Sequence, residues 1–487
     1  MVGIVSFGGY VPRLRLDRMA VLKSMGWFNP TLFATAQGER SMANWDEDSM
    51  TMAVSASRDC LIGVDKSKID AIYVASTTTP FTDRDNAGIL KAALNLRDEI
   101  VSAEFSSSLK AGTTALVTAL DAVKGGNKHQ ILVAASDNRR SKAASSQEMW
   151  FGDGAGALLV GDDNLIAEFL GSYSVSHDFV DHYRGSDVKY DYSWEERWIR
   201  DEGYSKIYPQ VFKGLLDKTD TSIKEISKVI YPCVFGRIHQ NLAIKSIGAS
   251  PEQIVDTMHT ETGECGTAHP YIMLAREMEQ AQPGDKIIVA GYGQGADALM
   301  FQMTENIKSL APRQGVSGYL SHKKVEDTYT KWLQFNELIE TDLGGRGEQD
   351  LRTGLSALWR HRKLVLGFVG GKCKECNTPQ IPPQRICVNP NCGAVDSLEE
   401  YEFADQPSSV LTFTADNLAA SLDPPAIYGM VQFEEGGRMM MDFTDCTLDE
   451  IEVGVPMEVT FRKKYHDPQR GFTGYFWKAV PKMAQEK

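Results

Sequence analysis

The chain has 487 residues, of which 42% are apolar and 24% charged, and 51 basic against 65 acidic side chains give a net charge of −14. This length predicts two or three domains, and the composition is typical of a soluble globular protein. An acidic chain disfavours nucleic acid, because phosphates need a basic face. We also expect no membrane partner, because no apolar run approaches the roughly 18 residues that span a bilayer.

The first segment, residues 1–12, is apolar and rich in glycine, and we interpret it as a strand. It lacks the basic region and the small-residue cleavage site of a signal peptide. The eight cysteines are too few for a disulfide scaffold. We therefore expect a cytoplasmic protein.

The first 305 residues contain an internal duplication. Each half has β-rich runs that follow helical stretches and a closing run rich in glycine and alanine. The matching pairs are 68–76 with 225–233, 131–136 with 287–291, and 152–160 with 293–301. This alternation predicts βαβ units with mostly parallel strands, stacked as two layers. A chance match between small-residue turns is the alternative interpretation.

One helix in each half begins with small residues. In the first half, residues 110–123 place Leu116, Leu120 and Val123 on one face, and glycines follow at 125 and 126. Its counterpart in the second half covers residues 266–275. The free N–H groups and positive dipole end of such a helix start suit a thiolate or an oxyanion.

These features resemble the thiolase superfamily, and within it the hydroxymethylglutaryl-CoA synthases of archaeal or bacterial type. The duplication, the first strand and residues 46–50, 104–113 and 151–157 carry the resemblance. It implies an α/β thiolase-like domain over residues 1–305, with stacked halves of about 1–163 and 164–305. It also implies an acyl-CoA substrate, condensation through an acyl-cysteine assisted by a glutamate and a histidine, and a homodimer.

The catalytic side chains of that family are missing at the matching positions. Leu109 stands where the family has its nucleophilic cysteine, Thr77 where it has the glutamate, and Pro232 where it has the histidine. A leucine cannot form an acyl thioester, so the covalent mechanism is excluded unless another nucleophile replaces it. Ser108 is one such alternative, although no Gly-x-Ser-x-Gly elbow surrounds it.

Two cations of this region are candidate contacts for coenzyme A. Arg237 follows Gly236 and resembles the family residue that meets the CoA phosphates, and Lys110 lies at the small-residue helix start. For Arg237 a solvated surface charge is an equal alternative.

The catalytic candidates are Glu264, Cys265, His269 and Tyr292. The first three lie within six residues at a helix start flanked by glycines, where His269 could act as a general base and Cys265 as a proton carrier. The phenol of Tyr292, on a glycine-rich loop, could polarise a carbonyl. Their structural alternatives are a capping carboxylate, a small buried side chain, a core imidazole and a cavity wall.

The carboxy-terminal third begins with a helical connector, residues 306–362, whose aromatic side chains are expected to need burial. Residues 363–398 then carry Cys373, Cys376, Cys387 and Cys392. Two closely spaced pairs of this kind predict a four-thiolate zinc site. All four positions around the metal are filled by protein, so we expect a structural zinc ribbon.

Five β-rich runs follow within residues 399–487, with a hairpin at residues 434–437, and they predict an OB-fold barrel. Barrel and ribbon together resemble the zinc-ribbon/OB-fold module that accompanies thiolase-like proteins, which implies a complex with such a subunit as an alternative to the homodimer. A stacking platform for nucleic acid at Phe472, Tyr475, Phe476 and Trp477 is disfavoured, because the barrel has a single basic cluster.

Three functions remain open. The first is aldol or retro-aldol chemistry on a 3-hydroxyacyl-CoA, which needs a base and an enolate site but no acyl-enzyme. The second is a non-catalytic scaffold that binds acyl-CoA and pairs with an active thiolase-like subunit. The third is a synthase with a displaced nucleophile, such as Ser108 or Cys265.

Overall fold

A computed structural model describes residues 1–342 and 353–483 of the chain. These residues form two compact units. Unit 1 comprises Met1–Ala43, Asp48–Gly88 and Leu96–Leu338, and unit 2 comprises Asn44–Glu47, Ile89–Asn95 and Ile339–Lys487. Among the described residues, no helix is both long and apolar enough to cross a membrane.

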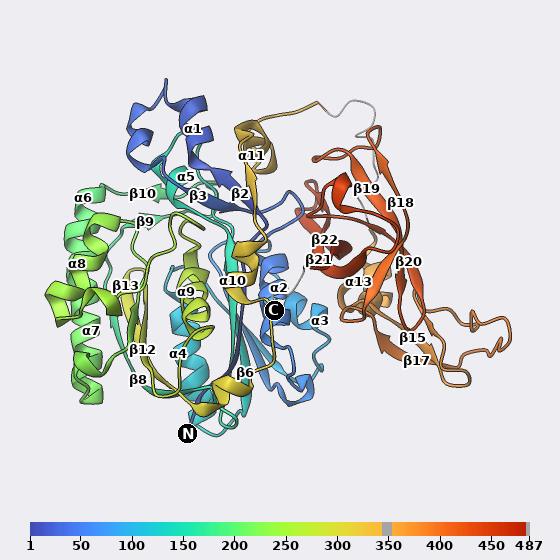
Figure 1. Cartoon of the computed structure of the whole chain (residues 1–487), viewed down its shortest axis with the longest axis horizontal. Coiled ribbons are helices and arrows are strands. Elements are labelled where there is room, and N and C mark those ends of the chain that lie inside the picture. The colour runs from blue at the N-terminus through green and yellow to red at the C-terminus, as the bar shows by residue number, and fades with distance from the viewer. Residues whose placement is uncertain (343–352, 484–487) are drawn as a thin grey trace. The chain divides into compact units, whose positions relative to one another are not determined.

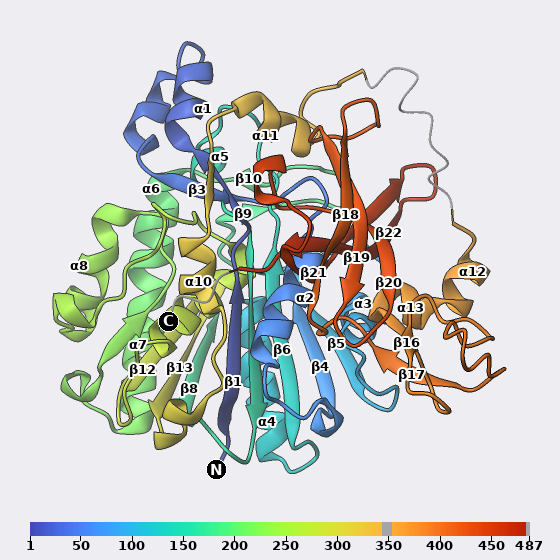
Figure 2. The same cartoon turned by 45° about the vertical axis from the view of Figure 1, so that its right-hand side comes forward.

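Unit 1 is organised around one sheet with the strand order β11-β12-β13-β8-β1-β7-β6-β4-β5 (Figure 2). Its two halves join where β1 pairs with β8 through Gly3 and Ile4 alone. The strands are β1 (Gly3–Tyr10), β4 (Ala71–Ala75), β5 (Val101–Phe105), β6 (Gln130–Asp137), β7 (Gly154–Gly161), β8 (Ala167–Ser176), β11 (Lys228–Ile230), β12 (Lys286–Tyr292) and β13 (Gly295–Met303).

The strand directions correct one expectation. The outer pairs β4–β5, β4–β6 and β11–β12 are parallel, but β6–β7, β12–β13 and the pairings of β1 and β8 are antiparallel. The prediction of mostly parallel strands was wrong, because β7 and β13 each run antiparallel to both of their neighbours. A short hairpin links β12 to β13, and antiparallel strands need no longer connection.

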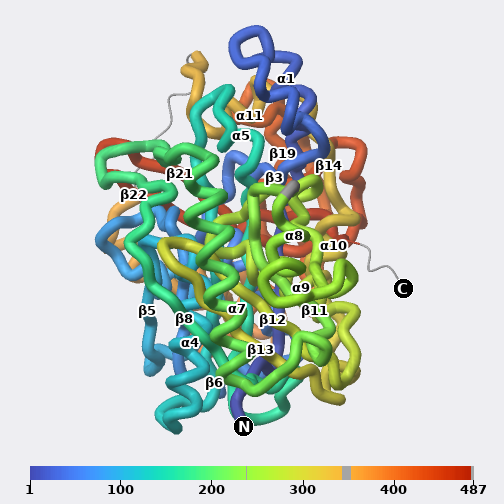
Figure 3. Tube along the Cα trace, turned by 90° about the vertical axis from the view of Figure 1, so that its left-hand side faces the viewer, coloured from blue at the N-terminus to red at the C-terminus, as the bar shows by residue number. Residues whose placement is uncertain are grey.

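Helices lie on both faces of each half (Figure 1). α4 (Ala111–Lys124) and α9 (His269–Met278) pack between the halves, whereas α2 (Ser49–Cys60) covers the first half, and α7 (Ser205–Thr219) and α8 (Gly236–Ile247) cover the second (Figure 3). α4 buries Leu116, Leu120 and Val123, and Gly125 caps its end. The strand order β1-β7-β6-β4 of the first half is thus repeated as β8-β13-β12-β11 in the second, which confirms the duplicated thiolase-like fold.

The remaining elements of the chain are short. Strands β2 (Leu14–Asp17), β3 (Glu39–Met42) and β14 (Lys324–Glu326) form a small sheet, and β9 (His182–Tyr183) and β10 (Tyr192–Ser193) form a hairpin. The other helices are α1 (Arg18–Met25), α3 (Asn86–Ala93), α5 (Ser146–Trp150), α6 (Glu196–Trp198), α10 (Gly315–Ser321), α11 (Tyr329–Phe335), α12 (Leu355–Arg360) and α13 (Arg362–Gly367), with a π-helical turn at Ile199–Tyr204 and a 3-10 turn at Gly266–Ala268.

Unit 2 contains a three-stranded ribbon sheet and a five-stranded barrel. The ribbon is β15 (Val369–Cys373), β16 (Pro379–Gln380) and β17 (Leu398–Glu402). The barrel has the order β20-β19-β18-β21-β22, and a bridge between Phe443 and Ala479 closes it. Its strands are β18 (Ser408–Asp416), β19 (Ala426–Phe433), β20 (Arg438–Asp442), β21 (Pro456–Asp467) and β22 (Phe472–Pro481). The predicted OB-type barrel is confirmed.

One expectation about aromatic side chains is wrong, and the disfavoured stacking platform is not formed by Tyr475 or Trp477. Tyr475 and Trp477 are buried inside the barrel, because inward and outward positions alternate along β22, so they offer no stacking platform. In the connector, Trp332 is buried in unit 1, but Trp359 is 66% exposed and lies against Arg362. Burial of every connector aromatic is therefore wrong.

Candidate functional site

The loop before α4 places Leu109 beneath a glycine of the β12–β13 hairpin. The Ser108 hydroxyl donates to the carbonyl oxygen of Gly293 at 2.7 Å. A Cβ atom on Gly293 would lie 2.8 Å from the backbone nitrogen of Leu109, so only glycine fits there. The Leu109 side chain is half-buried. The amino end of α4 therefore carries an apolar side chain at a tightly packed loop.

Lys110 is engaged within unit 1. Its Nζ lies 3.4 Å from the Asp297 carboxylate and donates to the Thr114 hydroxyl at 3.0 Å. Asp297 is buried, and the hydroxyls of Thr113 and Thr114 also donate to it. Lys110 thus offsets a buried carboxylate, and it remains a prediction as a CoA contact. The side chain of Arg237, on α8, lies outside the described residues.

A buried ion-pair network surrounds Glu264. Its carboxylate accepts a 2.8 Å bond from Arg139, and Arg139 also donates to Asp191 at 2.8 Å. Arg184 completes the network with a 2.7 Å bond to Asp191. Burial alone would lower the pKa of Arg139, but Asp191 and Glu264 raise it above its ordinary value. Burial would likewise raise the pKa of Asp191, yet Arg139 and Arg184 hold it lower.

A second buried carboxylate, Asp137 at the end of β6, organises the loop that carries Thr77. The Thr77 hydroxyl and amide donate to its Oδ1 at 3.0 and 2.7 Å, and the Thr267 amide donates to Oδ2 at 2.8 Å. Thr77 and Thr267 are therefore brought together from the two halves.

Sequence reasoning missed Asp137, Arg139 and Asp191. One signal was present, because Asp137 and Arg139 follow directly on the carboxyl end of a buried strand, where α/β folds place their ligands.

His269 and Cys265 are fully buried next to each other. The Nδ1 of His269 accepts the backbone N–H of Cys265 at 3.2 Å, and its Nε2 lies 2.8 Å from the Thr257 carbonyl oxygen. Both ring nitrogens are thus engaged, and burial lowers the pKa of the imidazole. The same burial raises the pKa of the Cys265 thiol. Their catalytic roles stay predictions.

Tyr292 faces away from α4. Its ring stacks on Tyr204 at a centroid distance of 4.2 Å, and its hydroxyl lies beside Gly203. Burial raises the pKa of the phenol. Because Gly291 packs against Thr113 of α4, the alternation along β12 sends Tyr292 to the opposite face. The structure brings Glu264, Cys265 and His269 together, but it does not bring Tyr292 to them.

The other cysteines of unit 1 are also buried thiols. Burial raises the pKa of Cys60 to about 12 and that of Cys233 to about 12. Burial thus disfavours the thiolate form of Cys60, Cys233 and Cys265.

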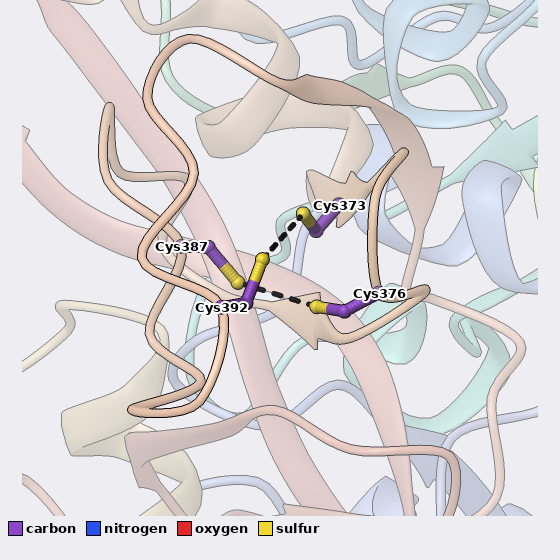
Figure 4. A group of neighbouring side chains, drawn as sticks. All are labelled: Cys373, Cys376, Cys387 and Cys392. Atoms are coloured by element: carbon purple, nitrogen blue, oxygen red, sulfur yellow. Dashed lines mark hydrogen bonds between the residues drawn. The ribbon is translucent and has the colours of Figure 1, made fainter.

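The four cysteines of the ribbon form a compact cluster (Figure 4). Their sulfur atoms all lie within 4.8 Å of one another, with 3.9 Å between Cys373 and Cys392 and 3.5 Å between Cys376 and Cys387. A tetrahedral site with metal–sulfur bonds of about 2.3 Å requires separations of about 3.8 Å. The donor set therefore fits a tetrahedral thiophilic metal ion.

Comparison with known proteins shows which curated proteins the chain is similar to. It is 30% identical over 311 residues to the hydroxymethylglutaryl-CoA synthase of Methanobrevibacter smithii, covering 63% of this chain and 89% of that protein.

The chain belongs to the hydroxymethylglutaryl-CoA synthase family.

Other members of this family are also similar. The synthase of Methanopyrus kandleri is 27% identical over 345 residues, which cover 70% of this chain and 98% of that protein. A crystal structure of HMG-CoA synthase complexed with CoA has a TM-score of 0.61 at 20% identity and covers 72% of this chain and 95% of its own. Residues 216–301 match the C-terminal domain of 3-oxoacyl-[acyl-carrier-protein] synthase III, and residues 404–462 match the C-terminal OB-fold domain of ChsH2. The predicted family and the fused OB-fold domain are confirmed.

Proposed function

We propose that this member of the hydroxymethylglutaryl-CoA synthase family makes or breaks a carbon–carbon bond of a 3-hydroxyacyl-CoA without an acyl-enzyme. One observation carries the proposal: the half-buried Leu109 occupies the amino end of α4, where the family has its nucleophilic cysteine. Acyl transfer needs an activated nucleophile. Aldol chemistry needs only a proton acceptor and stabilisation of an enolate.

In the cleavage direction, Glu264 takes the proton of the 3-hydroxyl group, the C2–C3 bond breaks, and the C3 oxygen becomes a carbonyl. The electron pair enters the thioester carbonyl as an enolate, and the proton held by Glu264 is then transferred to C2, which restores the carboxylate. Arg139, paired with Glu264, is placed to balance charge on that carboxylate. The amide groups at the start of α4 supply donors for the enolate oxygen.

In unit 2 we propose a structural zinc ion held by Cys373, Cys376, Cys387 and Cys392. A bound zinc ion would cross-link the ribbon, which is too small to build its own core. Four thiolates fill a tetrahedral shell and leave no position for a substrate or a water, so this site takes no part in the reaction.

A non-catalytic scaffold is the second candidate function, with the chain acting as an acyl-CoA-binding partner of an active thiolase-like subunit. The internal partners of Glu264, Cys265 and His269 favour it, because each polar group is already satisfied within unit 1. For a synthase with a displaced nucleophile, Ser108 is tied to Gly293 and Cys265 is fully buried.

The test is incubation of the full-length, zinc-loaded protein with a panel of branched 3-hydroxyacyl-CoAs. We expect release of acetyl-CoA or propionyl-CoA, loss of release in Glu264→Gln, and normal release in the matched surface variant Glu252→Gln. Turnover that requires a co-purified thiolase-like subunit would establish the scaffold instead. A stable acyl adduct in the intact mass would establish the synthase.

A further inference from the structure

A large aromatic cleft lies in unit 1 between the β9–β10 hairpin and the helices α6 and α7. Its volume is 860 Å³, and Phe179, Tyr183, Tyr192, Trp194 and Trp198 line it. Small-molecule sites have volumes of about 300–1,000 Å³ and mostly apolar walls with a few polar groups. The cleft therefore has the size and the lining of a ligand site. None of the candidate catalytic residues Glu264, Cys265 and His269 lines it.

The rings of the cleft form a continuous aromatic wall. Trp194 and Trp198 are stacked at 5.8 Å with an interplanar angle of 11°, and Phe179 packs on Trp194 at 5.9 Å. Both tryptophans remain more than 40% exposed. Contiguous exposed aromatic surface marks a binding site, and flat ring faces favour flat apolar ligands.

The charges around the cleft select against an anionic ligand. Asp178, Asp181 and Glu202 line it, and its single lysine, Lys206, is already paired with Glu202. A carboxylated acyl group would face uncompensated negative charge there.

Asp181 adds a specific polar contact. It is 5% exposed, and its Oδ1 makes no hydrogen bond within the described residues, although the Nδ1 of His182 lies 3.0 Å from it. A buried acceptor of this kind is costly unless it is satisfied, so a ligand hydroxyl fits it.

The β9–β10 hairpin connects the wall of the cleft with the polar network around Glu264. Phe179, which lines the cleft, lies with the Tyr292 hydroxyl beside Gly203. On the other side, the hairpin sends Arg184 to the carbonyl oxygen of Thr77 and to Asp191, which pairs with Arg139. The same hairpin thus forms one wall of the cleft and one edge of the network.

We infer that the aromatic cleft binds the acyl group of the substrate, and that this group is bulky, uncharged and flat-faced, with a hydroxyl that reaches Asp181. This inference rests on the proposed function for the thioester itself and goes further by assigning the substrate class. It separates the chain from relatives whose acyl group carries a carboxylate, as 3-hydroxy-3-methylglutaryl does.

The test is calorimetric titration of the full-length, zinc-loaded protein with acetyl-, glutaryl-, naphthoyl- and hydroxynaphthoyl-CoA. We expect naphthoyl-CoA to bind about tenfold more tightly than acetyl-CoA. Hydroxynaphthoyl-CoA should bind more tightly still, and glutaryl-CoA more weakly than acetyl-CoA. The double variant Trp194→Ala/Trp198→Ala should lose the preference for naphthoyl-CoA and keep the affinity for acetyl-CoA. Trp359→Ala, an exposed tryptophan of unit 2, is the matched control and should change neither. Asp178→Lys should improve glutaryl-CoA binding.

Equal affinities for all four thioesters would overturn the inference. The inference would also be overturned if the double tryptophan variant sedimented differently but kept its ligand preference. That result would mean that a second copy of the chain covers the cleft. Selective binding without any turnover would support the cleft assignment and refute only the proposed carbon–carbon chemistry. Turnover without selective binding would support the carbon–carbon chemistry and refute the cleft assignment.

Discussion

Replacing Arg139 by methionine tests whether the buried network holds the candidate site together. The methionine keeps most of the side-chain volume and removes the charge that Glu264 and Asp191 share. Both carboxylates are almost fully buried, with exposures of 7% and 4% for their side chains. Glu264 would keep one 3.0 Å bond from the Gly266 amide, and Asp191 would keep Arg184.

The expected cost is about 3–5 kcal/mol, the usual penalty for removing one partner of a buried ion pair. Arg140→Met is the matched control, because the neighbouring Arg140 forms a half-exposed pair with Glu337 that contributes about 0–1 kcal/mol. In the Glu264→Gln background, Arg139→Met should cost about 1–3 kcal/mol less, since one stranded charge is gone.

Stability should also depend on pH through Asp191. Its folded-state pKa is lowered, so its contribution is present above the unfolded pKa of about 3.9 and is lost as pH falls through the folded value. In Arg139→Met the contribution should be smaller, because burial is then opposed by Arg184 alone.

The measurement is hydrogen exchange by mass spectrometry on peptides of β6 and α4, which report on unit 1 alone. Unchanged protection in Arg139→Met, or a cost equal to that of Arg140→Met, would refute the reasoning.

Three further outcomes are expected. Leu109→Cys should acquire one acetyl group from acetyl-CoA in the intact mass, because a thiol at a helix start has a lowered pKa, whereas the native chain and Leu109→Ala should stay unmodified. Cys376→Ser should lower the zinc content from one ion per chain to none and should lower the melting temperature of unit 2. Cys446→Ser, outside the cluster, should leave the zinc content and the melting temperature unchanged. Asp46→Ala should destabilise unit 2 by about 3–5 kcal/mol in urea unfolding, because the carboxylate of the buried Asp46 lies 2.8 Å from the Nζ of the buried Lys478. If adding Lys478→Met restores none of this stability, the loss of the ion pair is not the cause.

Much of the architecture was predictable from local patterns. The spacing of Leu116, Leu120 and Val123 predicted the buried face of α4, and five β-rich runs predicted the barrel strands. The cysteine pairs were found because metal ligands on tight turns leave a short, specific spacing. The prediction that Leu109 replaces the family's cysteine likewise rests on the residues themselves.

Other features depend on contacts between segments that are far apart in the chain. Arg139, Asp191 and Glu264 meet only because the β9–β10 hairpin and the start of α9 converge on the end of β6. Tyr292 could not be assigned to a face from its neighbours, since β12 is buried on both sides and its pattern does not distinguish them. The direction of the strands and the aromatic cleft could not be predicted either, because both depend on contacts between distant segments.

The sequence by itself determined the duplicated layout and the cysteine cluster, and it predicted the loss of the nucleophile, because each depends on short-range spacing or on a single residue. Only the tertiary structure decided which polar groups pair with one another and which aromatic rings remain open to a ligand, because burial and charge pairing arise when distant segments pack.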